Sequence, residues 1–193
     1  VPSIPKVSIL LPCYNAEKYV GAAIESALTQ TWSNIEVIAV NDGSTDATRD
    51  VLRAYEPRGL IVIDQPNRGQ CAAANVAFRR SSGALIKFLD ADDLLSADHV
   101  RLQAARISEL GDDVAMGEWG RFYNDDLDKA DFRALPMYRD AEPVEWLAAE
   151  WLDAKPTTQC GCFLIPRTLL DRSGLWDERL SLINDFEFFT RVL

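Results

Sequence analysis

The first hundred residues alternate short apolar runs with segments whose apolar residues recur at helical spacing. The runs have the length and continuity of strands that are buried on both faces of a parallel sheet. They cover 7–12, 35–40, 60–64 and 85–90. The helical segments lie at about 20–28, 51–55, 70–80 and 96–111. This order predicts an α/β domain with an open, mostly parallel sheet and helices on both faces.

Polar residues and glycines at the segment boundaries predict where the helices begin and end. Asn15 is expected to cap the first helix and Ser44 or Thr45 the second, because these side chains accept hydrogen bonds from the free N–H groups of a first turn. Ser96 has the same position before the fourth helix. Gly83 is expected to end the third helix.

The regular alternation ends near residue 112. Beyond it, the pattern predicts a strand at 114–119, a charged irregular segment at 120–141, a helix at 143–152, a strand at 160–166, a short helix at 166–173 and a final helix from 184. Gly174 is placed to end the short helix. The final helix reaches Leu193 without a C-cap, Gly or Pro, so we expect the natural chain to continue.

The chain is acidic, and this narrows its partners. Its 193 residues include 20 Lys and Arg against 30 Asp and Glu, which gives a net charge of −10. Nucleic-acid binding is disfavoured because phosphate contacts need a basic face, and so is charge-driven binding to an anionic membrane. An anionic ligand requires a metal ion or backbone dipoles to offset the negative field. The apolar runs are far too short to span a bilayer.

Several enzyme classes lack their required motifs. No G-x-G-x-x-G follows the first strand, and there is no Walker phosphate loop or G-x-S-x-G elbow. The one histidine, His99, falls in the first turn of a predicted helix, where a surface or capping role is expected, and a Ser-His-Asp hydrolase is thereby excluded. Cys160 and Cys162 form the only close pair of cysteines, so buried thiols are expected rather than a zinc site.

Polar and acidic residues follow the predicted strands at the edge where an open parallel sheet binds ligands. Asp90, Asp92 and Asp93 are the strongest group, because hard oxygen ligands at this spacing suit Mg²⁺ or Mn²⁺. The alternative is a solvated acidic loop. An EF-hand does not fit, since Leu95 stands where its Gly belongs and Arg101 where its Glu belongs.

Other polar positions have two interpretations each. Asp42 supports a turn before a helix, or accepts hydrogen bonds from a base or ribose. The segment 67–69 forms a turn, with Asn75 as a buried polar contact, or brings Arg68 to a phosphate. Asp185 caps the final helix, or projects its carboxylate into a cleft.

Taken in order, these segments resemble the family 2 glycosyltransferases with a GT-A fold. The motifs that carry the resemblance are ILLPCYN, EVIAVNDGSTD, NRGQCAAANVAF, IKFLDADD, GLWDERL and NDFEFFTRVL. The similarity runs from Val7 to Leu193 and is weakest between about 120 and 158. It implies an inverting transfer of a sugar from a nucleoside-diphosphate donor. It also implies a single domain over 1–193, with a nucleotide-binding half at about 1–111 and an acceptor-side half at about 112–193.

The resemblance also implies roles for individual residues. Asp185 matches the family's general base, and Asn184 stands before it where Glu is common. Asp90 and Asp92 match the D-x-D pair that holds a divalent metal, with Asp93 beside them. The expected donor-binding residues are Pro12, Tyr14, Asn15, Asp42, Asn67, Arg68, Asp90 and Ala91. Pro12, Tyr14 and Asp42 are the ones expected at the nucleobase and ribose.

The expected partners are a UDP-sugar as preferred donor, with Mn²⁺ or Mg²⁺, and a carbohydrate or lipid-linked acceptor. The expected location is the cytoplasm, with docking at the inner membrane face left open. One alternative is a nucleotidyltransferase, although the Gly-rich basic loop of that class is missing after the first strand. Another is a non-catalytic nucleotide-sugar-binding domain, which would have no need of Asp185.

Overall fold

The computed structural model describes residues 4–110, 113–123, 126–132, 138–151, 159–182 and 184–193. Its main sheet has six strands in the order β3-β2-β1-β4-β8-β5. The strands are β1 (Val7–Cys13), β2 (Ile35–Asp42), β3 (Leu60–Gln65), β4 (Leu85–Phe88), β5 (Ala115–Met116) and β8 (Phe163–Pro166). The first four are parallel, and β8 runs antiparallel to both β4 and β5. The predicted open, mostly parallel sheet is confirmed.

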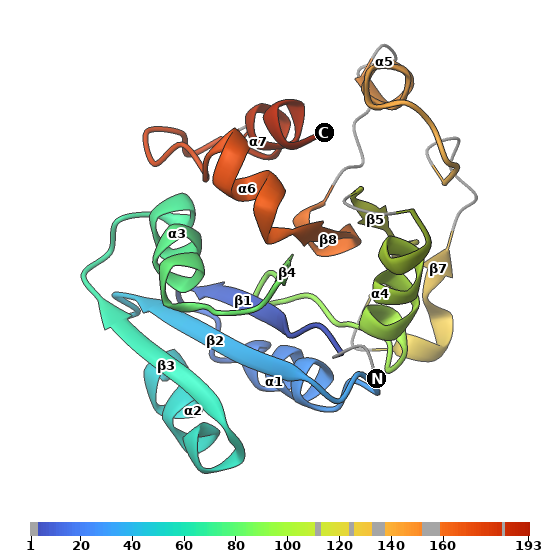
Figure 1. The fold of residues 1–193 in the computed structure, drawn as a ribbon. Coiled ribbons are helices and arrows are strands. Elements are labelled where there is room, and N and C mark those ends of the chain that lie inside the picture. The colour runs from blue at the N-terminus through green and yellow to red at the C-terminus, as the bar shows by residue number, and fades with distance from the viewer. Residues whose placement is uncertain (1–3, 111–112, 124–125, 133–137, 152–158, 183) are drawn as a thin grey trace.

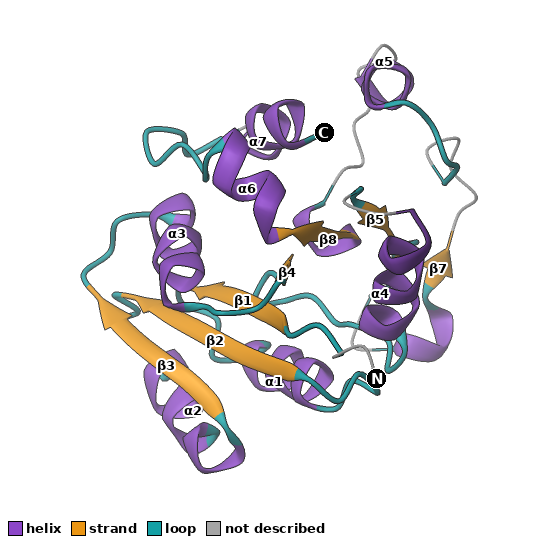
Figure 2. Ribbon diagram, viewed as in Figure 1, coloured by secondary structure: helices purple, strands orange, loops and turns teal. Residues whose placement is uncertain are grey.

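Helices cover both faces of this sheet (Figure 1). They are α1 (Val20–Leu28), α2 (Thr48–Ala54), α3 (Gln70–Arg80), α4 (His99–Leu110), α5 (Pro143–Trp151), α6 (Arg167–Ser173) and α7 (Asn184–Val192). Figure 2 distinguishes helices, strands and loops by colour, including the helices and short strands of the second half. That half contains a small hairpin of β6 (Gly120–Arg121) and β7 (Asp131–Phe132). Short 3₁₀ turns occur at Glu56–Arg58, Leu127–Lys129 and Cys160–Cys162.

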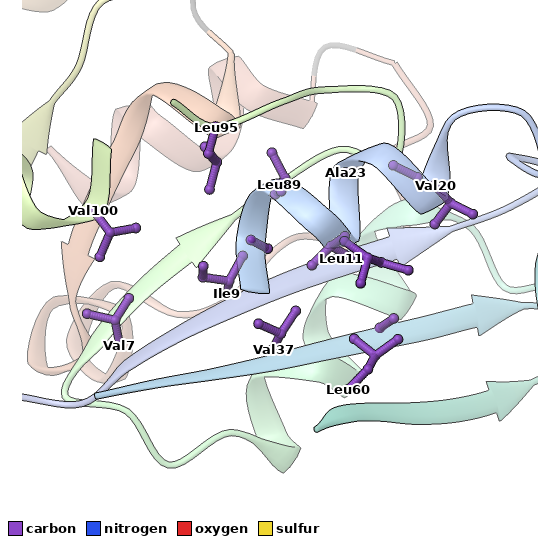
Figure 3. Close-up of a cluster of buried hydrophobic side chains, with 14 of the residues drawn as sticks. Val7, Ile9, Leu11, Val20, Ala23, Val37, Leu60, Leu89, Leu95 and Val100 are labelled. Carbon is purple, nitrogen blue, oxygen red and sulfur yellow. The ribbon is translucent and has the colours of Figure 1, made fainter. Parts of the chain in front are cut away.

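Alternating side chains of the central strand supply two hydrophobic cores. Val7, Ile9 and Leu11 of β1 are fully buried against α1, α2 and α4. Figure 3 shows Leu11 beside Ala23 of α1 in this core. Leu10 points to the opposite face, where the core includes residues of α3, α6 and α7. Burial on both faces explains why β1 is apolar along its whole length.

The helix starts differ from the predicted caps because neighbouring loops supply the acceptors. Asn15 does not cap α1: it lies in the left-handed region at φ 48°, and its Oδ1 accepts from the backbone N–H of Thr45 at 2.8 Å. Neither Ser44 nor Thr45 caps α2. Asp46 accepts from the Thr48 N–H at 2.9 Å, and Glu17 accepts from the Ala47 N–H at 2.8 Å.

Other predicted boundaries also need correction. The Val100 N–H of α4 donates to Gln30 Oε1 at 3.0 Å, a cap that comes from the end of α1 rather than from the side chain of Ser96. Helix α3 ends at Arg80 with Ser81 as its C-cap. Gly83 instead allows close packing, because a Cβ there would lie 2.4 Å from Ser8 Oγ. The predicted strand at 160–166 begins only at Phe163.

The cysteines are buried thiols, as the sequence predicted. All four cysteines are free and buried. Within the described ranges, no helix is both long enough and apolar enough to cross a bilayer.

His99, for which the sequence predicted a surface or capping role, is half-buried. Its Nε2 atom is buried and has no hydrogen-bond partner among the described residues. The ring packs against Gly117, where an added Cβ would lie 2.6 Å from Cε1. Burial, followed by the charge of Lys87, lowers the pKa of His99 from 6.5 to about 3.

This lowered pKa predicts acid sensitivity. Because the unfolded chain binds a proton near pH 6.5 and the folded ring does not, the contribution of His99 to stability is present above pH 6.5 and lost as the pH falls toward 3. Between about pH 7.5 and pH 5 the loss is about 2 kcal/mol. Urea unfolding of wild type and His99→Phe at both pH values measures it. An equal pH dependence in the two proteins would show that the ring is not held neutral.

Candidate functional site

The sheet brings the ends of β1, β2 and β4 together at one edge, because β1 lies between β2 and β4. Strand β4 ends at Phe88, and Asp90 is the second residue after it. Asp42 is the last residue of β2. Pro12 lies in β1, next to its last residue. The predicted convergence of polar residues at this edge is therefore a property of the sheet order.

A tight turn after β4 holds the acidic group. The Asp93 N–H donates to the Asp90 carbonyl at 3.1 Å. Asp90 and Asp93 are half-buried, Asp92 is exposed and Ala91 is buried. Partial burial raises the pKa of Asp93 to about 6, and the charges of Asp90 and Asp92 add to the effect.

Asp185, in the first turn of α7, belongs to the same cluster although it is 95 positions further along the chain. Partial burial raises the pKa of its carboxyl to about 6. The pKa of Asp90 is also raised to about 6, first by burial, then by the charge of Asp185 and then by that of Asp92. The two carboxylates thus lie close enough to repel each other.

A small pocket opens beside Asp90. It has about 10 Å³ of room, close to the space that one water needs. Its lining comes from five elements and includes Pro12, Gln70, Cys71, Phe88, Asp90, Cys160, Trp176 and Asn184. Gln70 Nε2 donates to Asp90 Oδ1 at 2.8 Å, and Cys160 lines the same small pocket as that carboxylate.

Asp42 holds the loop that precedes α3. Its carboxylate is buried and accepts from Gln65 Nε2 at 2.6 Å, from the Arg68 N–H at 2.9 Å and from the Gly69 N–H at 2.8 Å. The neighbouring Gly43 has φ 69°, and a Cβ there would lie 2.6 Å from the Asn67 nitrogen. Asp42 thus orders the loop before α3 rather than the turn before α2 that the sequence suggested, and a role at the nucleobase stays a prediction.

Tyr14 and Arg68, two of the predicted donor residues, lie outside the pocket. Tyr14 is exposed at the end of β1, with 52% of its surface accessible. The Arg68 guanidinium pairs with Glu178 at 2.9 Å. Glu178 also accepts from Asn75, whose amide bridges the backbone N–H and carbonyl of Trp176. Asn75 is thus the buried polar contact that the sequence suggested.

Sequence reasoning missed Gln70, Cys160 and Glu178 as neighbours of the site. Gln70 opens α3 and looks like an ordinary helix residue. Cys160 is separated from Asp90 by 70 positions. The position of Gln70 beyond the end of β3 was the only usable indication, because first helical turns at this edge face the ligand side.

Comparisons with known proteins agree with this architecture. The model of the family described as Glycosyl transferase family 2 matches residues 8–173. An uncharacterized glycosyltransferase of Rickettsia typhi is 30% identical over 190 residues, which are 98% of this chain and 59% of that protein.

Two solved structures share the fold. Residues 1–349 of Staphylococcus aureus TarS, in complex with UDP, match with a TM-score of 0.78 and 25% identity over 97% of this chain and 54% of that one. The mannosyltransferase PcManGT of Pyrobaculum calidifontis, with GDP-Man and Mn²⁺, matches with a TM-score of 0.68 and 20% identity over 99% and 52%. The chain thus spans little more than half the length of these proteins. It belongs to glycosyl transferase family 2 and has the GT-A fold.

Proposed function

We propose that the protein transfers a sugar from a nucleoside-diphosphate sugar to an acceptor hydroxyl with inversion at the anomeric carbon. The observation that carries the proposal is that Asp185 lies near enough to Asp90 for its charge to raise the pKa of Asp90, at the edge where open parallel sheets bind ligands. The similar protein TarS binds UDP in its crystal structure, and this supports a UDP-sugar as the preferred donor. We assign donor binding to about 1–111 and acceptor binding to about 112–193.

The acidic residues after β4 offer hard oxygen atoms of the kind that a divalent cation prefers. None of the ion pairs found among the described residues involves Asp90, Asp92, Asp93 or Asp185, so their negative charge is not neutralised by Lys or Arg there. In those residues, no three acidic, Cys or His side chains are already gathered as a metal site. We assign Mn²⁺ or Mg²⁺ to Asp90, Asp92 and Asp93. When bound, the ion neutralises charge that develops on the departing diphosphate.

The proposed donor-binding residues differ in the part of the donor that each side chain can contact. Tyr14 offers an exposed ring for stacking on the base. Asp42 already accepts three hydrogen bonds, which leaves one of its four acceptor positions for the base. Arg68 reaches a phosphate by leaving Glu178, an exchange between two anionic partners. Pro12, Asn15, Asn67 and Ala91 shape the surrounding walls.

Asp185 is assigned the role of general base. Its raised pKa, about 6, brings the carboxylate closer to neutral pH, where a base both stays ionised and accepts a proton effectively. It takes the proton of the acceptor hydroxyl while the oxygen attacks the face opposite the leaving group. We propose a carbohydrate or lipid-linked acceptor, reached in the cytoplasm or at the inner membrane face.

The raised pKa of Asp90 predicts that its carboxylate lowers the stability of the metal-free protein at neutral pH. Because the pKa of folded Asp90 is raised from 3.8 to about 6, its favourable contribution is complete below pH 3.8 and lost as the pH rises through 6. Without divalent cations, Asp90→Asn should therefore be more stable than wild type by about 2 kcal/mol near pH 7.5. Thermal unfolding at about pH 7.5 and pH 4 tests this. A variant that is less stable at the higher pH would contradict the raised pKa of Asp90, which burial causes first and the charges of Asp185 and Asp92 increase.

Nucleotide titration tests the donor site. UDP, dTDP, GDP and ADP are each added with Mn²⁺, Mg²⁺ or EDTA, and the melting temperature is followed. We expect UDP with metal to stabilise the protein by about 2.7 kcal/mol at 100 times its dissociation constant. The effect should disappear in Asp92→Asn and remain in Asp171→Asn, a control carboxylate exposed on α6. No response to any nucleotide would reject the donor assignment.

Asp185→Asn tests the base and separates transfer from binding. We expect transfer to fall by a factor of about 10² to 10⁴, because the acceptor proton loses its base. Metal-dependent UDP binding should stay within about twofold of wild type. UDP release from UDP-sugars with a panel of carbohydrate acceptors measures the first quantity, and calorimetry the second. Unchanged turnover would show that another group is the base, and unchanged binding without any wild-type turnover would favour a non-catalytic binding domain.

A further inference from the structure

A lysine is completely buried directly behind the acidic turn. Lys87 of β4 has no exposed surface. Its ammonium donates to the carbonyls of Gly161 at 2.5 Å and Phe163 at 3.3 Å, and to Gln103 Oε1 at 2.9 Å. All three acceptors are neutral, and the described part of the chain pairs no carboxylate with this ammonium.

Gln103 of α4 completes the same network. Its Nε2 donates to the Cys162 carbonyl at 2.6 Å and to the Ala115 carbonyl at 3.0 Å. The side chains of Lys87 and Gln103 therefore hold the successive carbonyls of residues 161, 162 and 163. These residues form the 3₁₀ turn at 160–162 and the first position of β8.

The opposite side of this turn faces the acidic cluster. Cys160, its first residue, lines the small pocket together with Asp90. Gly161 lies against Asp93, since an added Cβ would be 3.8 Å from Asp93 Oδ2. The turn is thus a wall of the site, and its carbonyls are anchored from behind by Lys87 and Gln103.

The anchoring charge is costly for the fold. Burial without a carboxylate partner lowers the pKa of Lys87 from 10.5 to about 7. Its neighbours along β4, Ile86 and Phe88, are apolar and buried. An apolar side chain of similar length would avoid the desolvation of an ammonium, and such replacements of buried charges are often neutral or stabilising. Stability of the core alone does not account for a lysine here.

We infer that Lys87 and Gln103 are positioning residues, which fix the turn at 160–162 so that Asp90 and Asp93 are held in the geometry that binds metal and diphosphate. This inference rests on the proposed function. Neither residue touches the pocket beside Asp90, so both act through the turn. Loss of either anchor releases the wall, and an error of a fraction of an ångström at metal-binding carboxylates weakens binding.

Calorimetric titration of Mn²⁺ with UDP tests this, using Lys87→Met, Gln103→Met and the double variant. We expect each single variant to bind at least tenfold more weakly than wild type, and the double variant to lose little more, because the two anchors act on one turn. Lys87→Met should unfold at or above the wild-type temperature. Lys129→Met, which removes an exposed lysine, is the matched control with unchanged binding.

Two results would overturn the inference. One is wild-type affinity in folded variants. The other is weaker binding that is fully explained by a smaller fraction of folded protein in both single variants. That result would indicate a purely structural role for Lys87 and Gln103. If wild type itself binds no nucleotide with metal, the proposed function fails, and a second readout decides the inference. Asp90→Asn is expected to raise the melting temperature of wild type. In the Lys87→Met variant, the same substitution should raise it by no more than half as much. An equal increase in both proteins would show that Lys87 and Asp90 are not coupled.

Discussion

Repulsion among half-buried carboxylates at one edge of the sheet is the constraint on which the rest of the structure depends. The parallel order of β2, β1 and β4 places their ends side by side, and α7 adds Asp185 to Asp90. Burial and this crowding together lower stability at neutral pH: the pKa of Asp90 is raised first by burial and then by its neighbours' charges, and the pKa of Asp185 is raised by burial. The fold tolerates it because β1 is buried on both faces, so the strands beneath the site are anchored by the two hydrophobic cores.

The loops at this edge stabilise one another, in addition to the local hydrogen bond from the Thr48 N–H to Asp46. Asn15 and Glu17, after β1, accept from backbone N–H groups of Thr45 and Ala47, after β2. Asp42 in turn accepts from the backbone of the loop before α3. Each loop is therefore ordered by its neighbour before any ligand arrives. This reduces the conformational entropy that donor binding would otherwise cost.

Local patterns predicted the elements well and their contacts poorly. The alanine-rich helix from Gln70 to Arg80 and the buried strands depend on periodicity and burial, which the sequence carries directly. The caps depend on which loop lies beside which, so Gln30 at the start of α4 was not predictable. The same reason hid the place of Cys160 in the small pocket with Asp90. His99 was misplaced because a first helical turn is usually exposed, whereas here the packing of α4 on β5 encloses the ring.

The turn at 160–162 separates a buried cation from a cluster of anions, and the separation has a chemical consequence. If the Lys87 ammonium paired directly with Asp90 or Asp93, it would occupy the position to which we assign a divalent ion and would neutralise the proposed ligands. By donating to the carbonyls of Gly161 and Phe163 instead, it stiffens the wall while the carboxylates keep their charge. The cost of burying an unpaired ammonium and the cost of crowding like charges therefore occur together, on opposite sides of one turn. Both features lower the stability of the fold, so folding alone does not explain them. They are expected where side chains are held in place in advance to bind a charged ligand.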